Sequence, residues 1–182
     1  MATVHVEAAV AGMPAAVPSA RPAGLLMKGA ASGLLAGAVM AGTLMLAASS
    51  TGMDVLHPMR AIGATFVGPE ALQGDMGIVA YGALLHATMS IAFGLLFVAV
   101  FPVDLRPLEA VVIGSGYAMF VLGFMAAAVV PSANGSFRVE MQPIGGAWVT
   151  AHALYGCALA LVASRLGGRR SAGAGPDRAD PP

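Results

Sequence analysis

The sequence contains little charge and only one cysteine. Charged residues make up 10% of its 182 residues, whereas soluble domains usually carry about 25%. Because Cys157 is the single cysteine, an internal disulfide and a metal site built from several cysteines are both excluded. We interpret Cys157 as a small buried hydrophobe rather than a reactive thiol. Acidic and basic residues number nine each, and this balance gives no general attraction to nucleic acid.

Charge is missing above all from four long apolar stretches. They cover residues 24–49, 76–101, 107–130 and 143–166. Each is near or above the roughly 20 residues that an α-helix needs to cross about 30 Å of hydrocarbon. The sequence therefore predicts an all-α membrane protein, a bundle of four transmembrane helices within residues 24–166, with the lipid bilayer as its surroundings.

Both ends of the chain differ in composition from this core. Residues 1–23 contain Pro14, Pro18 and Pro22 and have no basic cluster ahead of an apolar run. We therefore expect a flexible tail there rather than a cleavable signal peptide. Residues 167–182 are dominated by Gly, Ala, Arg and Pro, and this composition predicts a second flexible tail.

The first connection, about residues 50–75, is longer than a tight turn and contains a predicted short helix at 58–67. Pro58 suits a first helical turn, and Gly68-Pro69 ends the helix. Two arrangements are consistent with this segment: a helix that lies in the membrane interface, or an irregular cap over the bundle. In the first arrangement an apolar face contacts lipid. The residues of that face are Met59, Ile62, Phe66 and Val67.

Basic residues are distributed unequally between the two sides of a four-span topology. The side opposite the termini carries Arg60 and Arg138. Cytoplasmic flanks of membrane helices are enriched in Lys and Arg, so we predict a multi-pass membrane protein with both termini cytoplasmic. The basic residues on the side of the termini are Arg21, Lys28, Arg106, Arg165, Arg169, Arg170 and Arg178.

Two features bear on how the helices are arranged. The connection FPVDLRP at 101–107 is short and predicts that the second and third helices are antiparallel neighbours. The run LLHATMSIAFGLL around His86 resembles TAHALYGCALALV around His152. This similarity predicts that helices one–two and three–four are parallel repeats of a two-helix unit.

Small residues recur every four positions in three of the predicted helices, and this spacing places them on one helix face. Apolar area gives little drive for association within lipid, but small faces let helix backbones approach closely. We therefore predict tight packing at these positions, against another helix of the same chain in preference to a second copy. The predicted packing residues are Gly29, Gly33, Gly37 and Ala41 in the first helix, Gly82, Ser90 and Gly94 in the second, and Gly156 and Ala160 in the fourth.

His86 and His152 lie on two of these faces, at similar depth near mid-membrane for a rise of about 1.5 Å per residue. Ionisable residues at that depth usually face the bundle interior. Three roles are consistent with the pair: interhelical hydrogen bonds, binding of haem iron or a metal ion by imidazole nitrogen, and proton relay or the lining of a substrate path. For hydrogen bonding, the nearby partners are Thr88, Ser90, Thr150 and Tyr155.

The sequence shows no nucleophile–base pair and no acidic metal cluster, so no catalytic residue is assigned. The first hypothesis is a non-enzymatic small membrane component, either a homo-oligomer or an accessory subunit of a larger membrane complex. The second is an electron-transfer subunit in which His86 and His152 bind haem or a metal ion. The third is a small transporter or permeation pathway between the two repeats.

Three runs of sequence carry a family resemblance. HPMRAIGATFVGPEAL, followed by LLHATMSIAFG and later by WVTAHALYG, resembles a group of small, uncharacterised bacterial four-span membrane proteins. The resemblance covers residues 24–166 and implies a four-helix inner-membrane fold with the two histidines as family features, but it implies no activity. The matching positions are Pro58, Gly68, Pro69, His86, Ser90, His152, Tyr155 and Gly156.

Overall fold

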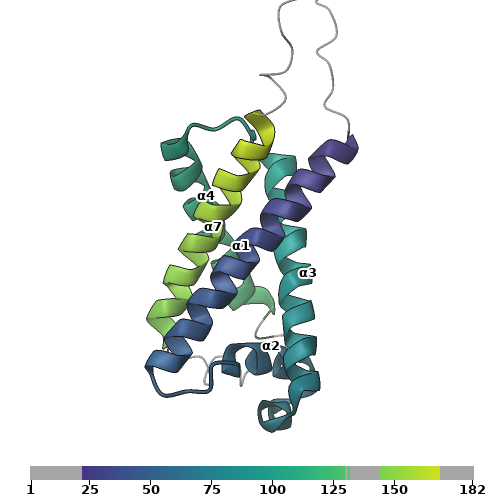
Figure 1. The fold of residues 1–182 in the computed structure, drawn as a ribbon, viewed down its shortest axis with the longest axis vertical. Helices are drawn as coiled ribbons and strands as arrows, with labels where there is room; N and C mark the ends of the chain where they lie inside the picture. The colour runs from purple at the N-terminus through teal and green to yellow at the C-terminus, as the bar shows by residue number, and fades with distance from the viewer. Residues whose placement is uncertain (1–21, 130, 132–143, 169–182) are drawn as a thin grey trace, which may run out of the picture.

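The computed structural model describes residues 22–129, 131 and 144–168. Within this part of the chain the regular elements are all helical, and four helices are long and apolar enough to cross a membrane. The predicted all-α bundle is therefore confirmed (Figure 1). The elements are α1 (Pro22–Ser50), α2 (His57–Val67), the 3-10 helix η2 (Pro69–Gln73), α3 (Met76–Val100), α4 (Pro107–Phe124), its π-helical continuation η3 (Met125–Val129) and α7 (Gly145–Gly168).

Some of the expectations drawn from the sequence fall outside the described residues. They concern most of both tails and the connection at 132–143. The basic residues in these segments are Arg21, Arg138, Arg169, Arg170 and Arg178.

Local signals set the helix ends. Asp75 caps α3, because its carboxylate accepts a hydrogen bond from the Gly77 amide at 2.8 Å. Pro107 occupies the first turn of α4, where its missing N–H costs no hydrogen bond. Gly68 follows the last residue of α2 with φ of 123°, a value that side chains with a Cβ rarely adopt. With α4 and η3 taken as one span, the observed helix ends lie within two residues of the ends of the apolar stretches.

The four long helices form an open row rather than a closed ring. α1 packs against α3 on one side and against α7 on the other, and α4 packs against α7. α1 crosses α3 and runs beside α7, and both described ends of the chain lie at the same end of the bundle (Figure 1). The order of packing is therefore α3, α1, α7, α4.

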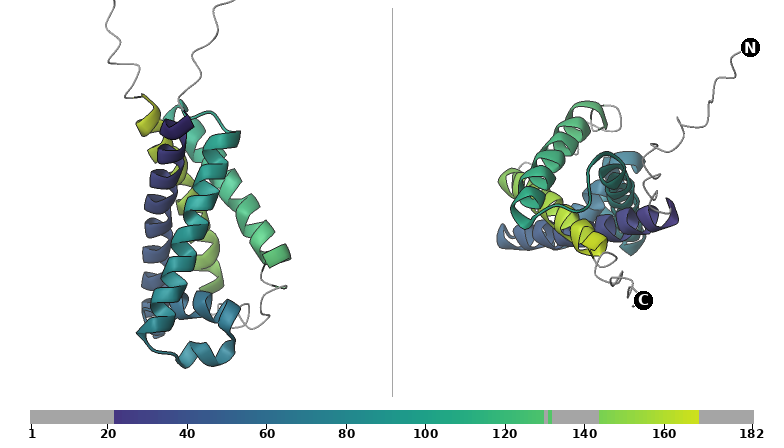
Figure 2. Two further views of the ribbon diagram at one scale, coloured as in Figure 1. Left: turned by 90° about the vertical axis from the view of Figure 1, so that its right-hand side faces the viewer. Right: turned by 90° about the horizontal axis from the view of Figure 1, so that it is seen from above.

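α3 and α4 are antiparallel as predicted, but they are neighbours only near their connection and do not pack along their lengths. α4 diverges from α3 towards its C-terminal end (Figure 2). Closer to their connection the two helices meet through aromatic side chains. The ring centroids of Phe97 and Tyr117 are 5.2 Å apart, and the Tyr117 hydroxyl donates to the Phe93 carbonyl at 2.7 Å. The fit of small residues between α4 and α7 draws α4 away from α3.

α2 is a regular helix that lies across the end of the bundle opposite the termini (Figure 1). The expectation of an irregular cap is therefore wrong. The predicted lipid-facing side is also wrong in part, because Met59 is buried against the protein and Ile62 is half-buried. Phe66 and Val67, in the last turn of α2, are exposed.

The α1–α3 and α4–α7 pairs pack in corresponding ways. A methyl group added at Gly33 would overlap the Ser90 carbonyl oxygen, and one added at Gly114 would overlap the Gly156 carbonyl oxygen. Both pairs thus depend on the absence of a Cβ at the point where the helix backbones meet. This correspondence is what a repeated two-helix unit predicts. The partner positions are Ser90 and Gly94 in α3, and Gly156 and Ala160 in α7.

Candidate functional site

His86 connects α3 to α1. Its Nε2 lies 2.9 Å from the carbonyl oxygen of Gly37, and because a carbonyl only accepts, Nε2 carries the proton and donates. Gly37 permits this contact, since a Cβ there would overlap the side chain of Ser90 and would lie 3.6 Å from Nε2 of His86. In a neutral imidazole Nδ1 of His86 then keeps a lone pair.

Tyr155 connects α7 to α3 at the same level. Its hydroxyl donates to the Ser90 carbonyl at 3.0 Å, and both residues are buried. Ser90 lies one helical turn from His86 on the same face of α3. α1, α3 and α7 therefore meet at a polar junction, which we define as Gly37, His86, Ser90, His152 and Tyr155.

His152 is buried, with 5% of its surface exposed. Among the titratable groups of this junction, only Tyr155 is less exposed. Its Nδ1 donates to the Trp148 carbonyl of the preceding turn at 2.9 Å, and the Trp148 ring lies against it with centroids 5.2 Å apart. Nε2 of a neutral His152 therefore keeps its lone pair. His86 and His152 each lie about one turn before the contacting pair Ser90 and Tyr155, so the structure places both histidines in one region of the bundle.

Two of the hydrogen-bond partners suggested by the sequence do not serve the histidines. The hydroxyl of Thr88 donates to Leu84 at 2.8 Å, and that of Thr150 donates to Gly146 at 3.1 Å. Both bonds remain within one helix, which is a usual arrangement for threonine in apolar surroundings. Of the four suggested partners, Ser90 and Tyr155 make the interhelical contact, and they make it with each other.

The predicted packing residues lie in three places. Gly29, Gly33 and Gly37 of α1 face Ser90, Gly94 and neighbouring residues of α3. Gly82 faces α2 instead, since a Cβ there would overlap the Met59 carbonyl. Ala41 is half-buried. The positions in α7 that meet α4 are Gly156 and Ala160.

Three contacts were not foreseen from the sequence. The Gly37 carbonyl is a backbone group, so no side-chain pattern could mark it as the partner of His86. Tyr117 gives no signal beyond a single polar aromatic residue in an apolar helix. Cys157 is half-buried, and its Sγ lies 3.1 Å from the Ser115 hydroxyl across the α4–α7 contact. That Ser115 of α4 lies next to Cys157 of α7 could be found only from the helix packing.

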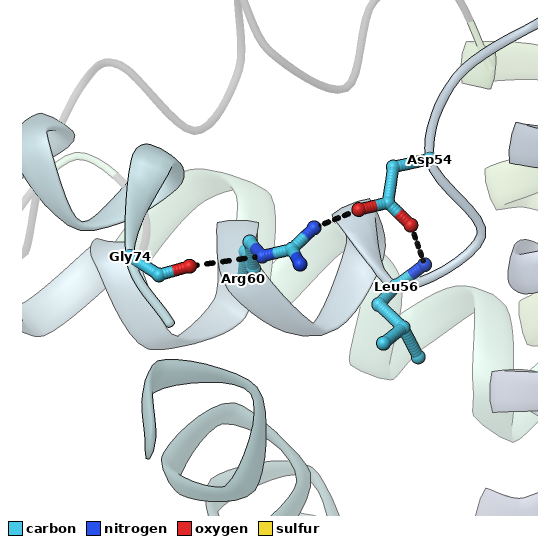
Figure 3. A network of polar contacts seen from close by, with 4 residues as sticks. All are labelled: Asp54, Leu56, Arg60 and Gly74. Atoms are coloured by element: carbon cyan, nitrogen blue, oxygen red, sulfur yellow. Dashed lines mark hydrogen bonds and ion pairs between the residues drawn. The ribbon is translucent and has the colours of Figure 1, made fainter. Parts of the chain in front are cut away.

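A second polar network lies at the end of the bundle that carries α2 (Figure 3). Arg60 forms an ion pair with Asp54, and its Nε donates to the Gly74 carbonyl at 3.2 Å. The Asp54 carboxylate also accepts the Leu56 amide at 2.9 Å. The backbone hydrogen bond from Leu56, together with Arg60, lowers the pKa of Asp54 below its ordinary value of 3.8. Arg60 thus fastens the start of α2 to the segment that precedes α3.

Among residues 22–129 and 144–168, no three His, Cys, Asp or Glu side chains are grouped closely enough to hold an ion together. Among the described residues, the side-chain nitrogen ligands of the polar junction are His86 and His152. Comparison with known proteins found no matching family model, no matching curated protein and no matching solved structure.

Proposed function

We propose that this chain is a non-enzymatic accessory component of a membrane assembly, and that it binds a transmembrane helix of a partner through the outward face of α4. The four apolar helices support a multi-pass membrane protein. Lys28, Arg106 and Arg165 lie at the end of the bundle where both described chain ends emerge. This distribution supports cytoplasmic termini, and we propose a bacterial inner membrane as the location.

The observation that carries the proposal is the one-sided packing of α4. Ala110, Gly114 and Ala118 are buried on the side that faces α7. On the opposite side, no described atom other than the adjacent residues and the backbone of the helix itself lies within 4 Å of a Cβ placed at Gly116 or Gly123.

This opposite side of α4 has the character of a helix-packing face. Gly116 and Gly123 are seven residues apart and so share a helix face. Phe120, between them, is 69% exposed. Glycine inside a helix costs about 1 kcal/mol relative to alanine, and a closely approaching helix offsets that cost. We call this surface, made of Val112, Gly116, Phe120 and Gly123, the open face of α4.

The proposal is tested by isolating the untagged protein from its native membrane in a mild detergent. We expect a complex of defined mass, containing either a second copy or another membrane protein. Gly116→Leu with Gly123→Leu should disrupt that complex, whereas Gly42→Leu on α1 should not, although Gly42 also has open space around it. A strictly monomeric protein that copurifies with nothing would contradict the proposal.

A cofactor-binding role is the second candidate, and the protonation pattern of the histidines favours it. Each imidazole donates its N–H to a backbone carbonyl, Gly37 for His86 and Trp148 for His152. Histidines that bind metals usually hold their second nitrogen in this way. A haem iron or metal ion bound there would supply one-electron chemistry.

An absorption spectrum and metal analysis of the untagged protein test this second candidate. A cofactor bound at the junction should be lost in His86→Ala and in His152→Ala. It should remain in His57→Ala, because His57 lies at the start of α2. A spectrum without haem and a preparation without stoichiometric metal would exclude the cofactor role.

A further inference from the structure

The last turn of α2 exposes apolar side chains at the end of the bundle. Phe66 and Val67 are each 59% exposed, and Met76 at the start of α3 is 62% exposed. Arg60, the only formally charged residue of α2, is paired with Asp54 and with the Gly74 carbonyl. α2 itself therefore adds no unpaired charge to this surface, and the nearest carboxylates, Glu70 and Asp75, lie in the connection between α2 and α3.

The depth of α2 follows from its contacts with α3. A Cβ at Gly63 would touch Ile78, and one at Gly82 would touch the backbone of Met59 and of Gly63. Gly82 lies six residues after the first residue of α3, which is about 9 Å along the helix axis. α2 therefore rests against the first two turns of α3 rather than beyond its end.

The length of α3 relates this depth to the bilayer. Its 25 residues extend for about 37 Å, and the hydrocarbon layer is about 30 Å thick. Even if the whole excess of about 7 Å projected at the α2 end, the hydrocarbon boundary would fall near Tyr81. Any tilt of α3 would move that boundary towards Met76. Tyr81 is partly exposed, as expected for an aromatic residue at a membrane interface.

From this register we infer that the C-terminal end of α2 is seated in the bilayer, with Phe66 and Val67 inserted at the boundary between lipid headgroups and acyl chains. The occupant of this surface is lipid rather than a soluble protein, because Gly63, one turn before Phe66 and Val67, packs on Ile78 in the first turn of α3, close to the hydrocarbon edge. The close backbone contacts with Gly82 and the Arg60 network hold α2 at that level. The inference does not depend on the proposed function.

The depth is measured with a single indole as a probe. Trp148 is the only tryptophan of the chain, so Trp148→Phe gives a background without indole. Phe66→Trp is introduced there, and Val67→Trp serves as an independent second variant. The full-length protein is placed in phosphatidylcholine vesicles whose acyl chains carry bromine either near the headgroup or near the methyl end. Glu70→Trp, at an exposed charged position, and Leu35→Trp, at an exposed position in the middle of α1, are the matched controls.

We expect the indoles at positions 66 and 67 to be quenched severalfold more by bromine near the headgroup than by bromine near the methyl end. They should also be protected from aqueous iodide. The position 35 control should show the reverse depth preference, and the position 70 control should be quenched by iodide. Quenching of positions 66 and 67 by iodide but not by bromine would overturn the inference in favour of a water-exposed surface. Protection from both quenchers would overturn it in favour of a protein cover.

Discussion

Nε2 of His86 donates a hydrogen bond to the carbonyl oxygen of Gly37 at 2.9 Å and so joins α3 to α1 within the polar junction. The same carbonyl belongs to a glycine whose missing Cβ makes room for Ser90. A polar side chain and a small residue therefore act at one contact, the first by bonding and the second by permitting the approach. In hydrocarbon such a bond is favourable because no water is present to compete for the donor or the acceptor.

His86→Leu should destabilise the protein modestly. The substitution removes the donor to Gly37 but keeps side-chain volume, so we expect a loss of about 0.6–1.7 kcal/mol of unfolding free energy. Reversible unfolding in mixed detergent micelles measures the change. His86→Gln, which retains an N–H donor, should recover part of the loss. Equal stability of the Leu variant and the unsubstituted protein would show that the bond is not formed.

Gly33→Ala should be more damaging than Gly42→Ala. A Cβ at Gly33 overlaps the Ser90 carbonyl and approaches Gly94 at 3.1 Å, whereas nothing described lies within 4 Å of a Cβ at Gly42. Forcing such an overlap costs about 1–3 kcal/mol, while Gly42→Ala should gain up to about 1 kcal/mol through helix propensity. Unfolding free energies of the two variants provide the comparison. Similar values would contradict the described α1–α3 contact.

The outline of the fold follows from the sequence because two strong signals agree. Long apolar runs fixed the helix positions, and the glycines at 33 and 94 marked a close helix contact before any partner was known. The order of packing could not be obtained in this way. The short connection after Val100 favoured contact between α3 and α4. Instead, α4 packs against α7, where Gly114 meets Gly156. Such a fit depends on the surfaces of both helices, and the pattern within one helix does not identify its partner.

The candidate site was predictable in its residues but not in its bonds. A histidine deep in an apolar helix is conspicuous, so His86 and His152 could be selected from sequence spacing. Their acceptors are backbone carbonyls of Gly37 and Trp148, which every residue possesses. The sequence therefore offers no means of choosing among them. The interior position of Met59 was missed for a related reason, since an apolar residue suits lipid and protein equally.

Tyr155→Phe should remove the bond between α7 and α3 without changing shape. The Tyr155 hydroxyl donates to the buried Ser90 carbonyl at 3.0 Å, so we expect a loss of about 0.5–1.5 kcal/mol. Tyr81→Phe is the control, because the Tyr81 side chain is partly exposed at the surface of α3. The same unfolding assay applies. If the two phenylalanine variants are equally stable, Tyr155 does not hold the junction together.

The Asp54–Arg60 network should lose its stabilising effect in acid. Because the pKa of Asp54 in the folded protein is lowered from 3.8, the carboxylate stabilises the fold above that pH, and the effect is lost as the pH falls further. The difference in unfolding midpoint between the unsubstituted protein and Asp54→Asn should therefore be largest at neutral pH and shrink below about pH 4. A difference that is independent of pH would show that the carboxylate is not paired.

The claim that the open face of α4 binds a partner helix is tested most directly by photo-crosslinking in native membranes. A photoreactive amino acid is placed at Gly116, and at Leu35 on the exposed side of α1 as a control. Our account predicts a discrete protein adduct from position 116 and only lipid adducts from position 35. Adducts to lipid alone from both positions would contradict the claim that α4 binds a partner helix.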